Sequence, residues 1–167
     1  TIVTADTPEY RKTAQLVAGF WQEVGVKTNV EYVSPRDMTR TVLRTREYDV
    51  LLYGAILGGD PDLFPLWHSS QIDFPGLNLA RYVNRAVDEF LAKARVAATD
   101  QERAEAYTKI EETILTDRPA VFLYSPTYRY ATIDKMKGVE IEHMFHPSDR
   151  LNSAVNWYIK TRWQWHW

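Results

Sequence analysis

Three residues of hydrolytic chemistry stand side by side in the sequence, His68-Ser69-Ser70, and two acids, Asp60 and Asp62, precede them. Hydrolases combine these residue types: a serine attacks the substrate, a histidine takes its proton and an acid orients the histidine. These serines lack the Gly-x-Ser-x-Gly turn that exposes such a nucleophile, and no pattern marks an oxyanion hole. Polar loop residues that bond to nearby backbone groups explain the cluster better, so a hydrolase using His68 with a nearby aspartate or serine is kept as an alternative.

Two further histidines, His143 and His146, raise the question of a metal site beside Glu142. A spacing of three residues places two side chains on one face of a helix, but residues 139–145 read as a strand and Pro147 follows. Surface or partly packed histidines are therefore the better interpretation.

The glycines Gly58 and Gly59 do not form a phosphate-binding motif, because Asp60 follows them and its carboxylate repels a phosphate. Together with Asp62 and Asp73, Asp60 is also too isolated for a calcium loop, which gathers about six to eight oxygen ligands. We therefore expect no metal and no cofactor. For Asp60 and Asp62, a turn that caps the next short helix and a place in a ligand site are both left open.

The composition fits one ordinary folded domain: 167 residues, 45% hydrophobic and 25% charged. Lys and Arg number 20 against 22 Asp and Glu, so no basic field attracts nucleic acid or anionic lipid. Zero cysteines exclude disulfides and thiolate sites but leave the compartment open. The longest apolar run, residues 50–57, is too short to span a membrane, and no export signal opens the chain. Because the first residue is Thr1 rather than Met, we expect a piece of a larger protein.

Alternating strand and helix patterns in the first third of the chain predict an α/β fold. Residues 2–5 are a β-branched run, and Thr7-Pro8 then caps a helix that Gly25 stops. Residues 26–32 alternate as a strand with one wetter face, and Ser34-Pro35 starts a second, weaker helix.

The unbroken apolar character of residues 50–57 predicts a central strand that is covered on both faces. This strand exits into Gly58-Gly59-Asp60-Pro61-Asp62, at the carboxyl end of the sheet, where open α/β sheets usually bind ligands. A long irregular stretch then runs to Val83, and loops of that length tend to be functional.

Two helices and further strands are predicted in the second half. Asn84 caps the first helix, and Thr99 caps the second in a capping box. Residues 120–124 and 127–133 then read as extended pieces, and residues 139–143 alternate in the same way.

Aromatic residues are 13% of the chain, and three tryptophans, Trp163, Trp165 and Trp167, alternate at its end. A strand would present all three on one face. This face either covers the domain's own sheet or docks on a partner domain, and stacking on sugar rings is a third, weaker possibility.

Motifs spread along nearly the whole chain carry a family resemblance. In order, they are Ala14, Trp21-Gln22-Glu23-Val24-Gly25-Val26, Tyr48-Asp49, Gly59-Asp60-Pro61-Asp62, Trp67-His68-Ser69-Ser70-Gln71, Asn78, Tyr82, Asn84, Val87-Asp88, Ala94, Glu102-Arg103, Tyr107, Asp117, Pro119 and Leu123-Tyr124. In its order and spacing this set resembles the extracytoplasmic solute-binding proteins of ABC importers, of the dipeptide, oligopeptide and nickel-binding class (family 5).

The resemblance implies an α/β lobe with a mixed, largely parallel sheet covered by helices, one of the two lobes of a periplasmic-binding-protein-like fold. Residues 1–167 would be most of the carboxyl-terminal lobe, with residues 157–167 as a docking tail toward the other lobe. It further implies an extracytoplasmic protein that captures a peptide or an oligosaccharide by hinge closure, without catalysis, and passes it to the membrane subunits of an importer. A protein-interaction module is kept as another alternative.

The resemblance also implies which residues line the ligand site. The expected contacts are Gly54, Leu57, Gly58, Gly59, Asp60 and Trp67. Peptide-binding members commonly carry a tryptophan and an aspartate where this chain has Gly54 and Leu57, and the aspartate meets the amino terminus of the peptide. Because Leu57 cannot pair with a buried ammonium group, an uncharged ligand such as an oligosaccharide becomes more plausible.

Overall fold

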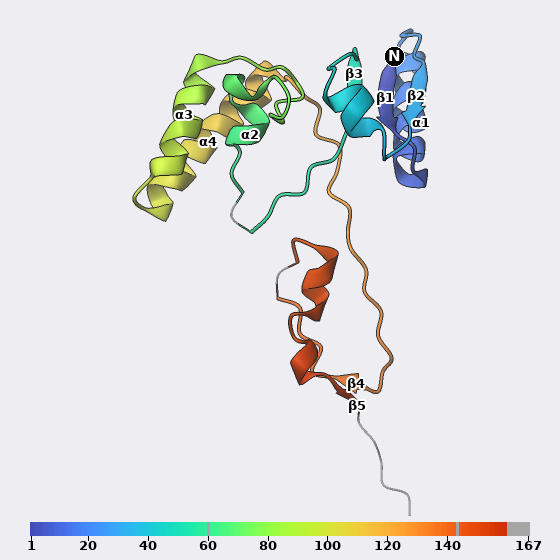
Figure 1. The fold of residues 1–167 in the computed structure, drawn as a ribbon, viewed down its shortest axis with the longest axis vertical. Helices are drawn as coiled ribbons and strands as arrows, with labels where there is room; N and C mark the ends of the chain where they lie inside the picture. Colours follow the sequence, from blue (N-terminus) through green and yellow to red (C-terminus); the bar gives the residue numbers. More distant parts are fainter. Residues whose placement is uncertain (60, 143, 160–167) are drawn as a thin grey trace, which may run out of the picture. The chain divides into compact units, whose positions relative to one another are not determined.

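A computed structural model describes residues 1–59, 61–142 and 144–159 of the chain, and these form two compact units (Figure 1). The first unit comprises Thr1–Ala55 and Asp62–Val121, and the second comprises the described residues of Ile56–Pro61 and Phe122–Trp167. The interpretation of residues 1–167 as one lobe with a docking tail at 157–167 stays a prediction. Trp163, Trp165 and Trp167 lie outside the described residues.

A parallel three-stranded sheet opens the first unit. β1 (Ile2–Ala5) lies between β2 (Val30–Val33) and β3 (Val50–Leu52), and both neighbours run parallel to it. The register sets these pairs opposite each other: Ile2 and Val30, Val3 and Glu31, Ile2 and Val50, Val3 and Leu51. Parallel strands joined by helical crossovers define an α/β fold, so the predicted fold class is confirmed.

The position of β3 corrects the sequence prediction. The apolar run of residues 50–57 predicts a long central strand, but the strand ends at Leu52 and lies at an edge of the sheet. The central place belongs to β1, whose Ile2 and Val3 are 1% and 5% exposed and whose Thr4 is fully buried. Continuous apolar character indicates burial of a strand but not which strand has two neighbours. Within the described residues, no strand pairs with the outer edge of β3.

Helix α1 (Pro8–Glu23) forms as its capping residues predict. The Thr7 side chain accepts the N–H of Tyr10, and Gly25 follows the helix with a φ of 84°, a left-handed conformation that glycine adopts without strain. The helix packs against β1, and its Ala14 is fully buried.

The π-helical segment η1 (Met38–Leu43) follows β2 after a turn that contains Pro35. Its Met38 and Val42 form a buried cluster with Val3 of β1. Ile2 and Thr4 point to the opposite face of the sheet by the alternation of a strand. The central strand β1 is therefore covered on both faces, whereas residues 53–57, for which this burial was predicted, are exposed.

A helical layer makes up the rest of the first unit. Its elements are α2 (Phe64–Trp67), the short η2 (Ser69–Gln71), α3 (Arg85–Val96) and α4 (Asp100–Asp117). As predicted, Asn84 caps α3 by accepting two backbone N–H groups, and Thr99 caps α4 by accepting the N–H of Glu102. The buried core of this layer comprises Tyr82, Val87, Leu91, Ile110 and Ile114.

The second unit contains less regular structure than the sequence predicts. Its elements are β4 (Met136–Lys137), η3 (Pro147–Leu151), η4 (Ala154–Asn156) and β5 (Tyr158–Ile159), and β4 pairs antiparallel with β5. Residues 120–124 and 127–133 belong to no strand, and Phe122 is 63% exposed. The predicted strands are wrong here, because an apolar run becomes a strand only where a partner supplies backbone hydrogen bonds.

Candidate functional site

The exit of β3 carries the first expected ligand contact, Gly54, which is exposed. A Cβ atom at this position would lie 2.5 Å from the hydroxyl oxygen of Tyr10. The space over Gly54 is thus occupied by a phenol from the first turn of α1. Because β1 and β3 are parallel, the segments that leave their carboxyl ends meet at the same edge of the sheet. Sequence reasoning did not single out Tyr10, because it meets Gly54 only in the folded chain.

Three more expected contacts, Leu57, Gly58 and Gly59, belong to the second unit. Leu57 is 45% exposed, and nothing lies within 4 Å of a Cβ atom built on Gly58. At Gly59 the same construction meets the ring of Phe145, with Cε2 at 2.9 Å. Asp60 lies outside the described residues, and its role stays a prediction.

Of the two interpretations of Asp62, a helix-capping turn and a ligand contact, the structure shows the helix-capping role. Its carboxylate accepts the N–H of Phe64, the first residue of α2, and forms an ion pair with Arg95 of α3. The hydrogen bonds from Arg95 hold the pKa of the Asp62 carboxyl below its usual range. Asp62 thus fixes the end of the loop to the helical layer.

Trp67, the expected aromatic wall, ends α2 and is half-buried. Its ring packs against the helical core and meets Tyr82 edge-on, with ring centroids 6.2 Å apart. A contact between Trp67 and a ligand stays a prediction.

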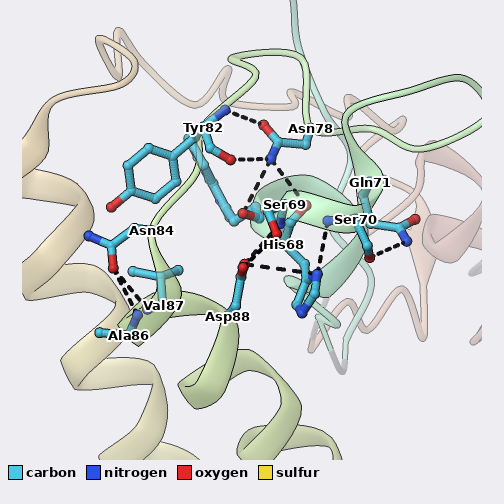
Figure 2. A network of polar contacts seen from close by, with 11 residues as sticks. His68, Ser69, Ser70, Gln71, Asn78, Tyr82, Asn84, Ala86, Val87 and Asp88 are labelled. Carbon is cyan, nitrogen blue, oxygen red and sulfur yellow. Dashed lines mark hydrogen bonds and ion pairs between the residues drawn. The ribbon is translucent and has the colours of Figure 1, made fainter.

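The residues of the hydrolase alternative bond to one another in a way that opposes catalysis (Figure 2). The Ser69 hydroxyl donates to Asp88 with Oγ–Oδ2 2.5 Å, and the Ser69 N–H donates to the same carboxylate. His68 Nδ1 accepts the N–H of Ser70 at 3.1 Å and lies 3.8 Å from Asp88, beyond hydrogen-bonding distance. A serine nucleophile would have to give its proton to the histidine, whereas Ser69 gives it to an acid. The hydrolase alternative is therefore wrong.

Buried amide and phenol groups extend this network and give it a structural purpose. The fully buried Asn78 accepts the Tyr82 N–H and donates to the carbonyls of Trp67, His68 and Tyr82 (Figure 2). The Tyr82 hydroxyl donates to Asp117, and burial together with this bond raises the pKa of Tyr82 to about 12. The network thus joins the irregular stretch after α2 to α3 and α4.

Metal and membrane chemistry find no support among the residues that the structure describes. Within residues 1–59, 61–142 and 144–159, no three acidic or histidine side chains are placed to hold a metal ion. His143, a member of the weighed histidine pair, lies outside the described part of the chain. None of the described helices has the length and apolar character needed to cross a bilayer.

Comparison with known proteins finds peptide-binding proteins among the relatives. The chain is 28% identical over 113 residues to the oligopeptide-binding protein AppA of Bacillus subtilis, covering 68% of this chain and 20% of the relative. It is also 28% identical over 131 residues to a probable di/tripeptide-binding protein of Pseudomonas aeruginosa, covering 77% of this chain and 24% of the relative. The chain thus spans about a fifth to a quarter of these relatives. No family model matches it.

The fold agrees with these relatives. The structure of AppA from Bacillus subtilis in complex with a nonapeptide superposes with a TM-score of 0.73 at 24% identity, over 96% of this chain and 31% of AppA. In sequence and fold the chain is similar to solute-binding proteins of family 5, among which the comparisons name oligopeptide-, di/tripeptide- and heme-binding proteins.

Proposed function

We propose that this chain is the ligand-capturing part of a solute-binding protein that delivers peptides to an ABC importer. The observation that carries the proposal is the match in both sequence and fold to AppA, whose structure holds a nonapeptide. In this proposal residues 1–167 are most of the carboxyl-terminal lobe of a longer protein, and residues 157–167 dock toward the other lobe. In this proposal the protein acts outside the cytoplasm, in keeping with a similar solved structure, that of DppA from Helicobacter pylori, which is described as a periplasmic binding protein.

The mechanism is binding by hinge closure. The ligand touches both lobes only in the closed state, so binding shifts the population from open to closed. The membrane subunits of the importer then recognise the closed form. The wall that this chain contributes comprises Gly54, Leu57, Gly58, Gly59, Asp60 and Trp67, and Tyr10 joins it through its contact with Gly54.

An oligosaccharide is the second candidate ligand, and Leu57 is the observation that favours it. Leu57 is half-exposed at the loop and cannot pair with the ammonium group of a peptide. A peptide is preferred because the relatives' names and the bound nonapeptide point to peptides. In this case another acid, on this lobe or the other, neutralises the amino terminus.

Calorimetric titration tests the proposal on this chain and on the complete product of its reading frame. A tight small-molecule site encloses roughly 70 to 90% of its ligand, so one lobe should bind Ala-Phe-Ala feebly. The complete protein should bind it tightly, with the peptide recovered intact. Submicromolar binding by this chain alone, or no peptide binding by the complete protein, would contradict the proposal. Tight binding of maltotriose instead would assign the oligosaccharide.

A further inference from the structure

An aromatic ring from the end of the chain packs against the proposed ligand loop. Phe145 lies so close to Gly59 that a Cβ atom there would be 2.9 Å from Cε2 and 3.2 Å from Cζ of the ring. Side chains larger than hydrogen do not fit at Gly59 unless the ring moves. Gly58 has open space instead. The loop thus has one glycine that is covered by a ring and one neighbouring glycine that is open.

The backbone beneath Phe145 is held by a carboxylate. Asp149 Oδ2 accepts the N–H groups of Phe145 and His146, each at 2.8 Å. Two charge-assisted bonds to one acid fix the start of η3, so the position of the ring is set by its own segment. The ring is nevertheless 46% exposed, which leaves apolar area open to a further partner.

The loop residues that precede Gly58 and Gly59 are aliphatic. Ile56 and Leu57 are 71% and 45% exposed, and the Cα of Leu57 lies within about 7.6 Å of the Gly59 Cα, because two peptide units span no more. A sugar-binding ring needs flanking groups that bond to hydroxyls, which Ile56 and Leu57 cannot do. An apolar side chain of a peptide loses no hydrogen bonds on such a surface.

From these contacts we infer that Phe145 is a ligand-contacting residue that selects peptides with an apolar side chain. The inference rests on the proposed function and deepens it. The ring of Phe145, held against Gly59, forms with Ile56 and Leu57 an apolar seat, and the bare backbone at Gly58 admits the ligand. Two stretches of sequence, residues 56–59 and the segment of Phe145, had to be brought together before this surface could be seen.

Glycine amide signals of the 167-residue chain test the inference. Labelling with 15N-glycine gives reporters at Gly54, Gly58 and Gly59 among the 7 glycines of the chain. Titration with Ala-Phe-Ala should shift the Gly58 and Gly59 signals, and Ala-Ser-Ala should need a roughly tenfold higher concentration for the same shift. Phe145→Ala should remove this difference and Phe145→Leu should retain most of it. Leu151→Ala changes an apolar residue of similar exposure, 48%, and should leave the difference intact.

Each other outcome has a defined meaning. Equal shifts with both peptides at Gly54, without shifts at Gly58 and Gly59, would overturn the apolar seat and leave the proposed function standing. A preference for Ala-Phe-Ala that persists in Phe145→Ala would also overturn the seat alone. No shift at Gly58 and Gly59 with either peptide would overturn the apolar seat but not the proposed function, which the calorimetry of the complete protein tests. Shifts at Gly58 and Gly59 with maltotriose alone would overturn the peptide assignment.

Discussion

Arg95 and Asp62, 33 residues apart in sequence, form a two-pronged ion pair: Arg95 Nη2 lies 2.5 Å and Nε 3.0 Å from Asp62 Oδ2. The guanidinium carbon also lies 3.8 Å from the centroid of the Phe64 ring. One side chain of α3 therefore holds both the end of the proposed ligand loop and the first residue of α2.

Replacing Arg95 with alanine should lower the free energy of unfolding modestly, because it removes a half-exposed ion pair and a cation–π contact. Urea unfolding at pH 7 measures the change. Arg85→Ala is the matched control, since its pair with Glu89 is more exposed, at 93% and 69%, and lacks an aromatic partner among the described contacts. Equal losses for the two variants would contradict this role of Arg95.

The same pair should make stability depend on pH. Arg95 lowers the pKa of Asp62 in the folded state, so the stabilisation is present above the unfolded value of about 4 and is lost as pH falls through the folded value. The difference in melting temperature between the wild type and Arg95→Ala should therefore shrink as the pH falls from 5 toward 2. A difference that stays constant over this range would assign the whole effect to Phe64.

Asp88→Ala should cost about 2 kcal/mol, because the Ser69 N–H and hydroxyl lose a charged acceptor in a site where the Asp88 side chain is only 18% exposed. Chemical denaturation gives the value. The next residue of α3 supplies the control: Glu89→Ala removes an exposed acid and should change stability by less than about 0.5 kcal/mol. If Asp88→Ala and Glu89→Ala lower the free energy of unfolding by the same small amount, the bonds between Ser69 and Asp88 do not hold the loop to α3.

Tyr82→Phe should lower the free energy of unfolding by about 1 kcal/mol at pH 7, through loss of the 2.5 Å bond from the Tyr82 hydroxyl to Asp117. The pKa of Tyr82 is raised to about 12 by burial and by this bond. Stability from Tyr82 is therefore complete below the unfolded value of about 10 and is lost as pH rises through 12. Absorbance at alkaline pH should show one late-ionising tyrosine that Tyr82→Phe removes; persistence of that late step would refute the assignment.

Two glycines should respond to alanine in opposite directions. At Gly76 an added Cβ would overlap the backbone carbonyl of Gln71, so Gly76→Ala should destabilise the chain by about 2 kcal/mol. Gly19, inside α1, has nothing within 4 Å, and Gly19→Ala should stabilise by about 0.5 to 1 kcal/mol through its helix propensity. The melting temperatures of the two variants test both expectations. An unchanged melting temperature for Gly76→Ala would mean that the backbone of the loop after η2 shifts at little cost in free energy.

Local signals predicted the helices well. Thr7, Asn84 and Thr99 all cap helices where the sequence placed them, because capping depends on residues within one turn. Strand positions depend on partners far along the chain. Residues 50–57 therefore gave an edge strand of three residues, and the apolar residues 120–124 gave none.

The residues of the candidate site also differ in whether their partners are near or far in the sequence. The turn role of Asp62 could be predicted because its partner in α2 is two residues away. Tyr10 and Phe145 could not, since each reaches its glycine only through the fold, from 44 residues before Gly54 and 86 residues after Gly59. The sequence therefore located the loop and missed the two rings that cover its glycines.

The affinity of the complete protein for Ala-Phe-Ala, measured by calorimetry for the wild type and for Gly54→Leu, tests most directly whether the exit of β3 faces the ligand. Gly54 is exposed, so leucine should leave the melting temperature nearly unchanged while it displaces Tyr10 and fills the site. The expected result is a loss of affinity of at least about tenfold. Undiminished affinity in a folded Gly54→Leu protein would show that the ligand binds elsewhere.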